Sequence, residues 1–302
     1  MKLAAITITY NDDYKFNEWC ENFSSYKDVI YKSIIVDNGS EKEYLNKVKE
    51  SFPNSFIIER SSNGGCTAAY NDGIKFALQD EQVDTILLVG NDILISADSL
   101  KLMYLTLKNH DDIGMVGSLM FKKDSNEIIE DFGCSIDSNL YLKVHSTGKC
   151  FDLTLPDIKI VDTVPGGLNM STRSFYEKVG FQDEKLFMYS DEVDMGLRAI
   201  KSGFKMAVLR DAKSWHQHIN PNGRNIRLPY SAYLIGRNKI YLAYKHFGFI
   251  KVLKVFLYQL FCFAKLFIAS FKHLSFTYSK WFLIGVFSGI FRTNRFDKYI
   301  LK

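Results

Sequence analysis

The chain has 302 residues, of which 47% are hydrophobic and 24% charged, and its formal net charge is +4. This composition is typical of a folded globular protein and excludes a disordered chain, collagen and a coiled coil. The charge is unevenly distributed, because residues 230–302 carry 12 Lys and Arg, a single acid and 20 of the 44 aromatic residues. Residues 1–229 carry a net charge of −7. A basic, aromatic tail on an acidic body indicates an anionic partner, either a membrane or a nucleic acid.

Short apolar runs alternate with helical patterns in the first half of the chain. We predict strands at 3–9, 33–37, 56–59 and 85–89, and helices at about 15–25, 41–51, 65–79 and 97–109. Such alternation is typical of a parallel sheet that is covered by helices on both faces. Ligands bind to such sheets beyond the carboxyl ends of the strands. In this chain those ends carry polar, turn-forming segments, which read TYNDD, DNGS, SSNGG and GND.

The second half is less regular. We predict strands at 115–121, 158–164 and 206–209 and helices at about 172–179 and 192–202. The segment Pro221-Asn222-Gly223 and the change of charge place a domain boundary near 225–230. We therefore expect a catalytic domain at 1–228, divided into halves at 1–112 and 113–228, and a basic helical region at 229–302.

The cysteines and the N-terminus indicate a cytoplasmic protein. The five cysteines are scattered and contain no C-x-x-C pair, so neither a disulfide framework nor a zinc site is expected. The N-terminal segment MKLAAITITYN lacks the long apolar stretch of a signal peptide and is better explained as a first buried strand.

Two turns are candidates for binding a nucleotide. Asp37 can accept hydrogen bonds from a base or ribose, and Gly39 lets a ligand approach the backbone, although an ordinary Asx turn is an equal alternative. Gly64 and Gly65 precede a helix and could offer backbone N–H groups to a phosphate, although glycines there more often serve only as a cap. The chain contains neither G-x-G-x-x-G nor a P-loop sequence, which disfavours both of those phosphate-binding motifs.

A metal site is indicated where the most apolar strand ends. Asp92 follows that strand and could hold a hard divalent cation that bridges a diphosphate. The alternative is a helix cap for 97–109, a role that Ser96 or Asp98 could take instead. His216 and His218 follow a short strand, and either of them is a candidate for the second metal ligand.

A cluster of acids is the candidate for general base catalysis. Asp191, Glu192 and Asp194 fall within four residues at the start of a predicted helix. Acids in a first turn complement the helix dipole, but three of them are more than capping requires. A neighbouring carboxylate raises the pKa of one member of such a pair, which suits a general base.

In their order and spacing these segments resemble glycosyltransferase family 2. The quoted segments are TITYN, IIVDNGS, SSNGGCTAAYNDGI, LLVGNDILI, PGGLNMSTRSFYEKVGF, LFMYSDEVDMGLRAIKSGF and DAKSWH, which span about 1–218. They are most similar to the rhamnosyl- and galactofuranosyltransferase branches of bacterial surface polysaccharide synthesis. The resemblance implies an α/β GT-A fold with a mostly parallel central sheet, an inverting mechanism, a UDP- or dTDP-sugar donor and Mn²⁺ or Mg²⁺.

The same resemblance implies roles for individual residues. The nucleotide-sugar site would be lined by Thr9, Tyr10, Asn11, Asp37, Asn38, Gly39, Asn63, Gly64, Asn71 and Asn91. The metal would be bound by Asp92 and His216, and the acceptor side would be formed by Gly166, Gly167 and Trp215. The base would be Glu192, with Asp191 as a rival because the family often shows Glu-Asp at this point, and Asp194 and Arg198 would support them. The first acid of the family's D-x-D motif is absent, since Gly90-Asn91 stands in its place.

The tail is the candidate for membrane binding. Residues 249–271 are long enough to span a bilayer, but lysines within the segment make insertion costly. Lys251, Lys254, Lys265 and Lys272 fall on one side of a helix, which is typical of a helix that lies in the membrane interface. A second such piece is predicted at 281–291, and the alternative is a buried helical subdomain. The aromatic residues are mixed with Leu, Ile and Val, which disfavours nucleic acid as the partner.

The sequence thus predicts an inverting, metal-dependent glycosyltransferase of cell-surface polysaccharide biosynthesis. It would bind the anionic cytoplasmic face of the cell membrane through 245–302, as a peripheral or monotopic protein, and extend a saccharide carried on a polyprenyl lipid. One alternative is a sugar nucleotidyltransferase, which would need a Gly-rich basic loop near the N-terminus, whereas residues 1–20 contain only Lys2 and Lys15 and no glycine. The other is a catalytically inactive, membrane-bound scaffold with the same fold, which the missing acid motivates.

Overall fold

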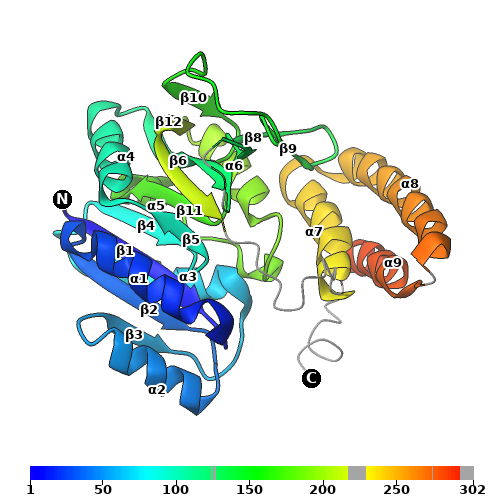
Figure 1. The fold of residues 1–302 in the computed structure, drawn as a ribbon. Helices are drawn as coiled ribbons and strands as arrows, with labels where there is room; N and C mark the ends of the chain where they lie inside the picture. Colours follow the sequence, from blue (N-terminus) through cyan, green and yellow to red (C-terminus); the bar gives the residue numbers. More distant parts are fainter. Residues whose placement is uncertain (124, 126, 217–228, 274, 293–302) are drawn as a thin grey trace.

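The computed structural model describes residues 1–123, 125, 127–216, 229–273 and 275–292. A central sheet carries helices on both faces, and a helical unit formed by the C-terminal part of the chain lies beside it (Figure 1). His218, the tripeptide 221–223 and the basic residues beyond 292 lie outside the described residues, as do the side chains of Lys272 and His273.

Within the described residues, the strands form one large sheet and one small hairpin. The order in the large sheet is β10-β12-β6-β11-β4-β1-β2-β3, while β5 pairs with β12, β7 pairs with β6, and β8 and β9 form the hairpin. The strands are β1 (Leu3–Thr9), β2 (Lys32–Asp37), β3 (Phe56–Glu59), β4 (Thr85–Val89), β5 (Ile93–Ile95), β6 (Ile113–Lys122), β7 (Ile129–Asp131), β8 (Cys134–Ile136), β9 (Leu142–Val144), β10 (Ile158–Val161), β11 (Leu168–Thr172) and β12 (Lys205–His216).

The first half of the sheet is parallel, as predicted, and the second half is mixed. The pairs β1–β2, β1–β4 and β2–β3 are parallel, whereas β11 runs antiparallel to both β4 and β6. Since Leu168 pairs with Val89, the residues just before β11 meet the residues just after β4. The Gly90 N–H accordingly donates to the Gly167 carbonyl at 2.8 Å. The antiparallel strand therefore brings the Gly166–Gly167 turn to the carboxyl end of β4.

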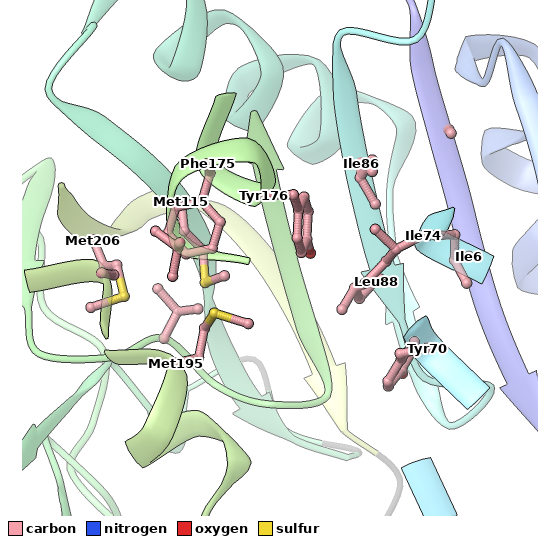
Figure 2. Packing of buried hydrophobic residues seen from close by; sticks show 14 of the residues in the cluster. Ile6, Tyr70, Ile74, Ile86, Leu88, Met115, Phe175, Tyr176, Met195 and Met206 are labelled. Atoms are coloured by element: carbon pink, nitrogen blue, oxygen red, sulfur yellow. The ribbon is translucent and has the colours of Figure 1, made fainter. Parts of the chain in front are cut away.

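Helices cover the sheet according to the alternation of apolar residues in the strands. Ile34 and Val36 face one side, which α3 (Gly65–Leu78), α5 (Arg173–Val179) and α6 (Asp191–Lys201) cover. Figure 2 shows the packed core on this side, with Ile74 of α3 beside Ile6 and Met195 of α6 beside Met115. The opposite face is covered by α1 (Phe16–Tyr26), α2 (Lys42–Ser51) and α4 (Ala97–Asn109).

The C-terminal helices have their own core, to which the sheet domain also contributes. The helices are α7 (Pro229–Phe247), α8 (Phe249–His273) and α9 (Thr277–Ile290). Leu140, Leu186 and Val193 pack into the same cluster as Ile240 and Val286. Most residues of α7 are buried, so this helix lies between the sheet domain and the other two helices (Figure 1).

The predicted interfacial piece at 281–291 is instead an internal helix. α9 packs so closely on α7 that a Cβ at Gly285 would lie 2.1 Å from the Tyr233 carbonyl oxygen. Phe282 and Val286 are buried in this contact. Small residues permit the close approach of the two helices, and the sequence pattern at 281–291 reflects that packing rather than an independent surface helix.

The helix α8 has an outward apolar face. Phe249–Phe271 is long and apolar enough to cross a membrane, and only 17% of it is buried. Ile250, Leu257 and Ile268 are 74%, 58% and 70% exposed, and they fall within about 20° of one another around the helix. Lys254 and Lys265 are exposed as well, and they lie about 40° and 60° to one side of Ile250. Three sides of α8 thus differ: one is packed on the protein, one is apolar and exposed, and one is basic.

Candidate active site

The carboxyl end of β2 carries a buried carboxylate with one unused oxygen. Asp37 is 1% exposed, and its Oδ2 accepts hydrogen bonds from the N–H groups of Gly39 at 3.2 Å and Ser40 at 3.0 Å. The Asx turn is therefore formed. Asp37 Oδ1 has no hydrogen-bond partner among the described residues. A buried oxygen without a partner is costly, so this atom suits a hydroxyl or N–H group of a ligand.

The neighbouring turn residues mainly hold two loops together. Gly39 has φ +87°, and a Cβ there would lie 2.7 Å from the backbone of Ser62, so the contact with a second loop by itself requires glycine. Asn38 Nδ2 donates to Asn63 Oδ1 at 2.9 Å, and Asn38 Oδ1 accepts from the Gly64 N–H at 3.1 Å. These side chains fix the shape of the pocket edge and are buried or half-buried.

Two backbone N–H groups at the N-terminus of α3 are used within the protein. The Gly65 N–H donates to Asn63 Oδ1 at 2.9 Å, and the Thr67 N–H donates to the Phe187 carbonyl at 3.3 Å. These contacts form because the loop before α6 packs against this helix end. The binding of a phosphate by Gly64 and this helix end stays a prediction, and in this structure the N–H groups of Gly65 and Thr67 already have partners.

The residues after β1 form a second internal network. The Thr9 hydroxyl is buried and bonds to the Tyr44 hydroxyl, and it accepts from Asn91 Nδ2 at 3.3 Å. Asn91 Nδ2 also donates to Asp12 Oδ2 at 2.8 Å. Asn91, which replaces the first acid of D-x-D, therefore braces the ends of β1 and β4. Thr9 supports the predicted pocket from behind instead of lining it.

Tyr10, Asn11 and Asn71 have different surroundings. Tyr10 is 44% exposed, so its ring is accessible to a base. Asn11 Oδ1 accepts from the Glu41 N–H at 3.0 Å, which ties this turn to the start of α2. Asn71 is buried and bonds to both the N–H and the carbonyl of Gln182 at 2.9 Å. It braces that loop and does not form the pocket wall that the resemblance implied.

Asp92 and His216 meet at one edge of the sheet. Asp92 Oδ2 lies 3.7 Å from His216 Nε2 and 3.4 Å from Lys15 Nζ, and His216 Nδ1 lies 2.9 Å from Glu130 Oε1. Burial alone would raise the pKa of Asp92, but the nearby His216 and the charge of Lys15 lower it to about 2. Burial would likewise lower the pKa of His216, but Asp92 and Glu130 raise it to about 9.

This group fits a divalent cation in part. A carboxylate and an imidazole with a carboxylate behind the ring are a common ligand arrangement, in which Glu130 would orient His216. Within the described ranges, no group of three or more His, Cys, Asp or Glu side chains could hold a metal by itself. Asp92 and His216 could therefore hold a cation only together with other donors, such as diphosphate oxygens and water.

The acids at the start of α6 face the glycine turn. A Cβ at Gly166 would lie 2.1 Å from Glu192 Oε1, so the absence of a side chain there leaves room for this carboxylate. Gly166, Asp191 and Glu192 line the same small cavity, together with Asn169. Burial raises the pKa of Glu192, and burial together with the Glu192 charge raises the pKa of Asp191 well above its usual range. Because the two carboxylates are buried and close together, ionisation of one disfavours ionisation of the other.

The loop that leads into α6 is held in an unusual conformation by α7. Phe187, Tyr189 and Ser190 have φ of 64°, 64° and 66°, which L residues rarely adopt. Asn238 on α7 is fully buried, and its Nδ2 donates to the carbonyls of Leu186, Met188 and Tyr189 at 3.1, 3.0 and 2.8 Å. Asn238 thus fixes the backbone immediately before the two acids.

The third acid has a structural role. Asp194 is fully buried and pairs with Arg198 Nε at 2.9 Å, Lys245 Nζ at 2.7 Å and His246 Nε2 at 2.8 Å. Burial alone would raise the pKa of Asp194, but His246, Arg198 and Lys245 lower it strongly. Arg198 therefore contacts Asp194 directly and not the two catalytic candidates, and together these residues join α6 to α7.

Several neighbours of the site were not predicted. Glu130 reaches His216 from a strand 86 residues earlier, and Lys239 of α7 is buried close to Glu192. Burial lowers the pKa of Lys239 to about 8, although Glu192 and Asp137 oppose this change. Only Asp12 and Lys15 carried a local signal, since both belong to the polar segment after the first strand. Trp215, expected on the acceptor side, stacks on Phe121 with ring centroids 6.1 Å apart.

A sheet of this topology, with an acid after β4 and paired carboxylates at the start of α6, defines a glycosyltransferase with the GT-A fold. The family model of glycosyl transferase family 2 matches residues 5–150, just under half of the chain, and this match supports a glycosyltransferase of family 2. The match excludes the segment with Asp191, Glu192 and His216, whose roles rest on the geometry described above.

Three similar proteins bear on this assignment. The low-salt glycan biosynthesis hexosyltransferase Agl10 of Haloferax volcanii is 23% identical over 230 residues, which cover 75% of this chain and 72% of the relative. A mannosyltransferase of Pyrobaculum calidifontis, solved with GDP-Man and Mn²⁺, has a TM-score of 0.56 at 12% identity and covers 97% of this chain and 88% of its own. GalNAc-T7 with UDP, GalNAc and Mn²⁺ has a TM-score of 0.57 at 11% identity; it covers 78% of this chain, which spans about half the length of that protein (47%).

Proposed function

We propose that the protein is an inverting glycosyltransferase that moves a sugar from a nucleoside diphosphate donor, UDP- or dTDP-linked, to a lipid-linked saccharide. The single observation that carries the proposal is the placement of Asp92 and His216 at the edge of the sheet next to the Gly166–Gly167 turn, which Glu192 faces. The nucleotide would bind at Asp37 and Tyr10. The glycan biosynthesis relative supports a role in cell-surface polysaccharide synthesis.

In the proposed reaction the acceptor hydroxyl enters the cavity beside Gly166. The carboxylate of Glu192 takes its proton, since burial raises the pKa of this group toward the range that suits a general base. The acceptor oxygen forms a bond to the anomeric carbon while the bond from that carbon to the diphosphate oxygen breaks. Attack from the face opposite the leaving group inverts the configuration, and no covalent intermediate with the protein is required.

A divalent cation, Mn²⁺ or Mg²⁺, belongs to this proposal. Asp92 and His216 would hold it, and Glu130 would orient the imidazole. When bound, the cation supplies positive charge to the departing diphosphate. The Mn²⁺ in two similar solved structures supports its presence.

The membrane part of the proposal rests on α8. Its exposed apolar residues and adjacent lysines suit an anionic bilayer surface, with the helix axis parallel to the membrane plane and the apolar side chains below the head groups. Such seating at the cytoplasmic face would bring a polyprenyl-linked acceptor close to the sheet domain. The region that contacts lipid would then be α8 rather than the whole of 245–302, because α9 is largely internal.

The experiment that tests the proposed function combines donor binding with transfer. UDP-, dTDP- and GDP-sugars are screened by thermal shift with Mn²⁺ and with EDTA, since a ligand that binds only the folded state raises its stability. The stabilising donor is then incubated with a polyprenyl-diphosphate-linked saccharide, and NMR of the product gives the anomeric configuration. Transfer with inversion is the expected result. Retention of configuration contradicts the mechanism, and so does transfer at the wild-type rate by both the Glu192→Gln and the Asp191→Asn variant.

A further inference from the structure

Lys15 places an ammonium group inside the candidate metal and diphosphate site. It follows β1 in a short 3-10 turn, and only 9% of the residue is exposed. Its Nζ lies 3.4 Å from Asp92 Oδ2, to which it donates, and 3.7 Å from Asp12 Oδ1. Lysine is seldom buried unless it is paired, and here Asp92 and Asp12 are its partners. What needs an explanation is why a lysine occupies the place beside the candidate metal ligand Asp92.

A donor diphosphate beside Asp92 and His216 would need positive charge or N–H donors, and the surrounding residues that the structure describes supply few of them. The first acid of D-x-D is replaced by Asn91, whose amide is used to brace Thr9 and Asp12. The N–H groups of Gly65 and Thr67 at the end of α3 are also used internally. A diphosphate at this edge of the sheet would therefore meet the side chains of Lys15 and His216.

We propose that Lys15 binds the diphosphate of the donor and shares Asp92 with the divalent cation. This inference rests on the proposed function and deepens it. Without donor, Lys15 is held by Asp92 and Asp12. When the donor is bound, the ammonium group of Lys15 can keep its ion pair with Asp12 and donate to a diphosphate oxygen, which releases an Asp92 oxygen for a cation. Lys15 would thus supply part of the positive charge that a metal ion held by a complete D-x-D motif would supply.

The competing explanation is that Lys15 only neutralises Asp92 and Asp12 when no metal is present. Lys15 would then compete with the cation and make no contact with the diphosphate. Both explanations predict a lower affinity for a nucleoside diphosphate in EDTA when the charge of Lys15 is removed, because unpaired Asp92 and Asp12 carboxylates repel a diphosphate. They differ when the carboxylates are also neutralised: direct binding by Lys15 predicts that the Lys15→Met loss persists in an Asp12→Asn, Asp92→Asn background, whereas simple neutralisation predicts that the loss disappears there.

The test is calorimetric binding of UDP, dTDP and GDP, with the corresponding nucleosides, in EDTA and in Mn²⁺. The variants are Lys15→Met, which keeps the aliphatic length, Lys15→Arg, which keeps the charge, and Lys32→Met as a matched control. Lys32 is also a half-buried, ion-paired lysine, with Asp80 at 2.9 Å, but it lies at the beginning of β2, at the opposite edge of the sheet. Lys15→Met is also made in an Asp12→Asn, Asp92→Asn background, and that background alone is its reference. None of these measurements requires turnover.

We expect Lys15→Met to weaken diphosphate binding in EDTA by about tenfold or more, since a hydrogen bond to a charged group is lost. Nucleoside binding should be unchanged, Lys15→Arg should restore most of the affinity, and Lys32→Met should bind as the wild type does. The loss should persist in the Asp12→Asn, Asp92→Asn background. Equal diphosphate affinity of Lys15→Met and wild type in EDTA, or a loss that disappears in that background, overturns this inference alone. A wild-type protein that binds none of the three diphosphates, with or without Mn²⁺, overturns the proposed function together with it.

Discussion

The side-chain amide of Asn238 donates a 2.8 Å hydrogen bond to the carbonyl of Tyr189, two residues before Asp191. This contact joins the C-terminal helices to the backbone immediately before Asp191 and Glu192, the two candidate catalytic acids. Arg237 supports it from the other side, because its guanidinium donates to Asn238 Oδ1 at 2.7 Å. The conformation of the loop, with its positive φ values, is thus determined by a helix that begins about 40 residues later in the chain.

Replacing Asn238 by Ala should lower kcat by about tenfold or more, because three buried carbonyls lose their donor and the loop can relax away from its strained conformation. KM for the donor should change little, since Asp37 and Asp92 lie on other elements. Gln259→Ala is the matched control: Gln259 is a buried amide of α8 that accepts from Tyr141 and does not touch the loop. Steady-state kinetics and melting temperatures measure both effects. Equal losses of kcat in the two variants would contradict the positioning role.

The choice between the two acids can be decided by single amide substitutions. Glu192→Gln should reduce kcat by about 10²–10⁴-fold, the usual contribution of a general base. Asp191→Asn should retain most of the activity if Glu192 is the base, because ionisation of Glu192 disfavours a second charge on the neighbouring Asp191. In the wild type kcat/KM should fall as the pH decreases through the raised pKa of Glu192. The opposite ranking of the two variants would assign the base to Asp191.

Glu130 should control metal affinity through His216. Glu130→Gln is expected to weaken Mn²⁺ binding by about 10–100-fold, the usual effect of removing a carboxylate that orients a histidine ligand. The measurement is Mn²⁺ binding in the presence of nucleoside diphosphate, followed by electron paramagnetic resonance. Glu127→Gln, an exposed residue three positions earlier, provides the control and should bind Mn²⁺ normally. Unchanged affinity in Glu130→Gln would exclude His216 as a ligand oriented by this carboxylate.

Asp194 should make the fold sensitive to acid. Its pKa in the folded protein lies below the ordinary value of 3.8, so its ion pairs contribute stability that is present above that pH and is lost as the pH falls through the folded pKa. Asp194→Asn should cost about 3–5 kcal/mol at neutral pH, as for other buried ion pairs that lose one partner. Thermal unfolding between pH 3 and pH 8, given as rough limits, should show the difference from wild type shrinking in acid. The exposed Asp98→Asn serves as the control, and a pH-independent difference would argue against the ion pairs.

Membrane binding should depend on the outward face of α8. The triple variant Ile250→Asn, Leu257→Asn, Phe261→Asn should bind phosphatidylglycerol vesicles at least about tenfold more weakly than the wild type. The reason is that the exposed apolar area of these side chains no longer enters the membrane interface. The double variant Lys254→Glu, Lys265→Glu should bind anionic vesicles more weakly than the wild type, and its binding to neutral vesicles should be unchanged. Flotation assays at two salt concentrations measure both. Full vesicle binding by the triple variant would place the membrane contact elsewhere.

Much of the first half of the fold could be predicted from the sequence. The strands β1, β3 and β4 and the helix α4 begin and end where the apolar runs and turn residues indicated, because local periodicity determines these elements. The antiparallel insertion of β11 could not be predicted, since continuous apolar strands do not reveal which neighbour they pair with. The long β12 was also underestimated, because its polar end at Lys213 and His216 is paired with β6 and β5.

The site was predictable only where its chemistry lies in short motifs. Asp92 and Glu192 stood out because each follows a recognisable strand or precedes a helix. Glu130 and Asn238 did not, since their partners lie 86 and about 50 residues away and only the tertiary fold brings them together. The glycine at 39 shows why such turns are ambiguous: the contact with the Ser62 backbone requires glycine there, and a contact between loops leaves the same trace in a sequence as a contact with a ligand.

The burial of α7 between the sheet domain and the other two helices has a practical consequence for dissecting the molecule. A fragment that ends at residue 228 would lose the donors to the loop before α6 and expose the apolar surface around Leu186 and Val193. Such a fragment should aggregate in detergent-free buffer. It should also be inactive with a soluble acceptor, for which no membrane is needed. The C-terminal helices therefore hold the loop before α6 in place, and loss of activity on truncation would not by itself measure the need for a membrane.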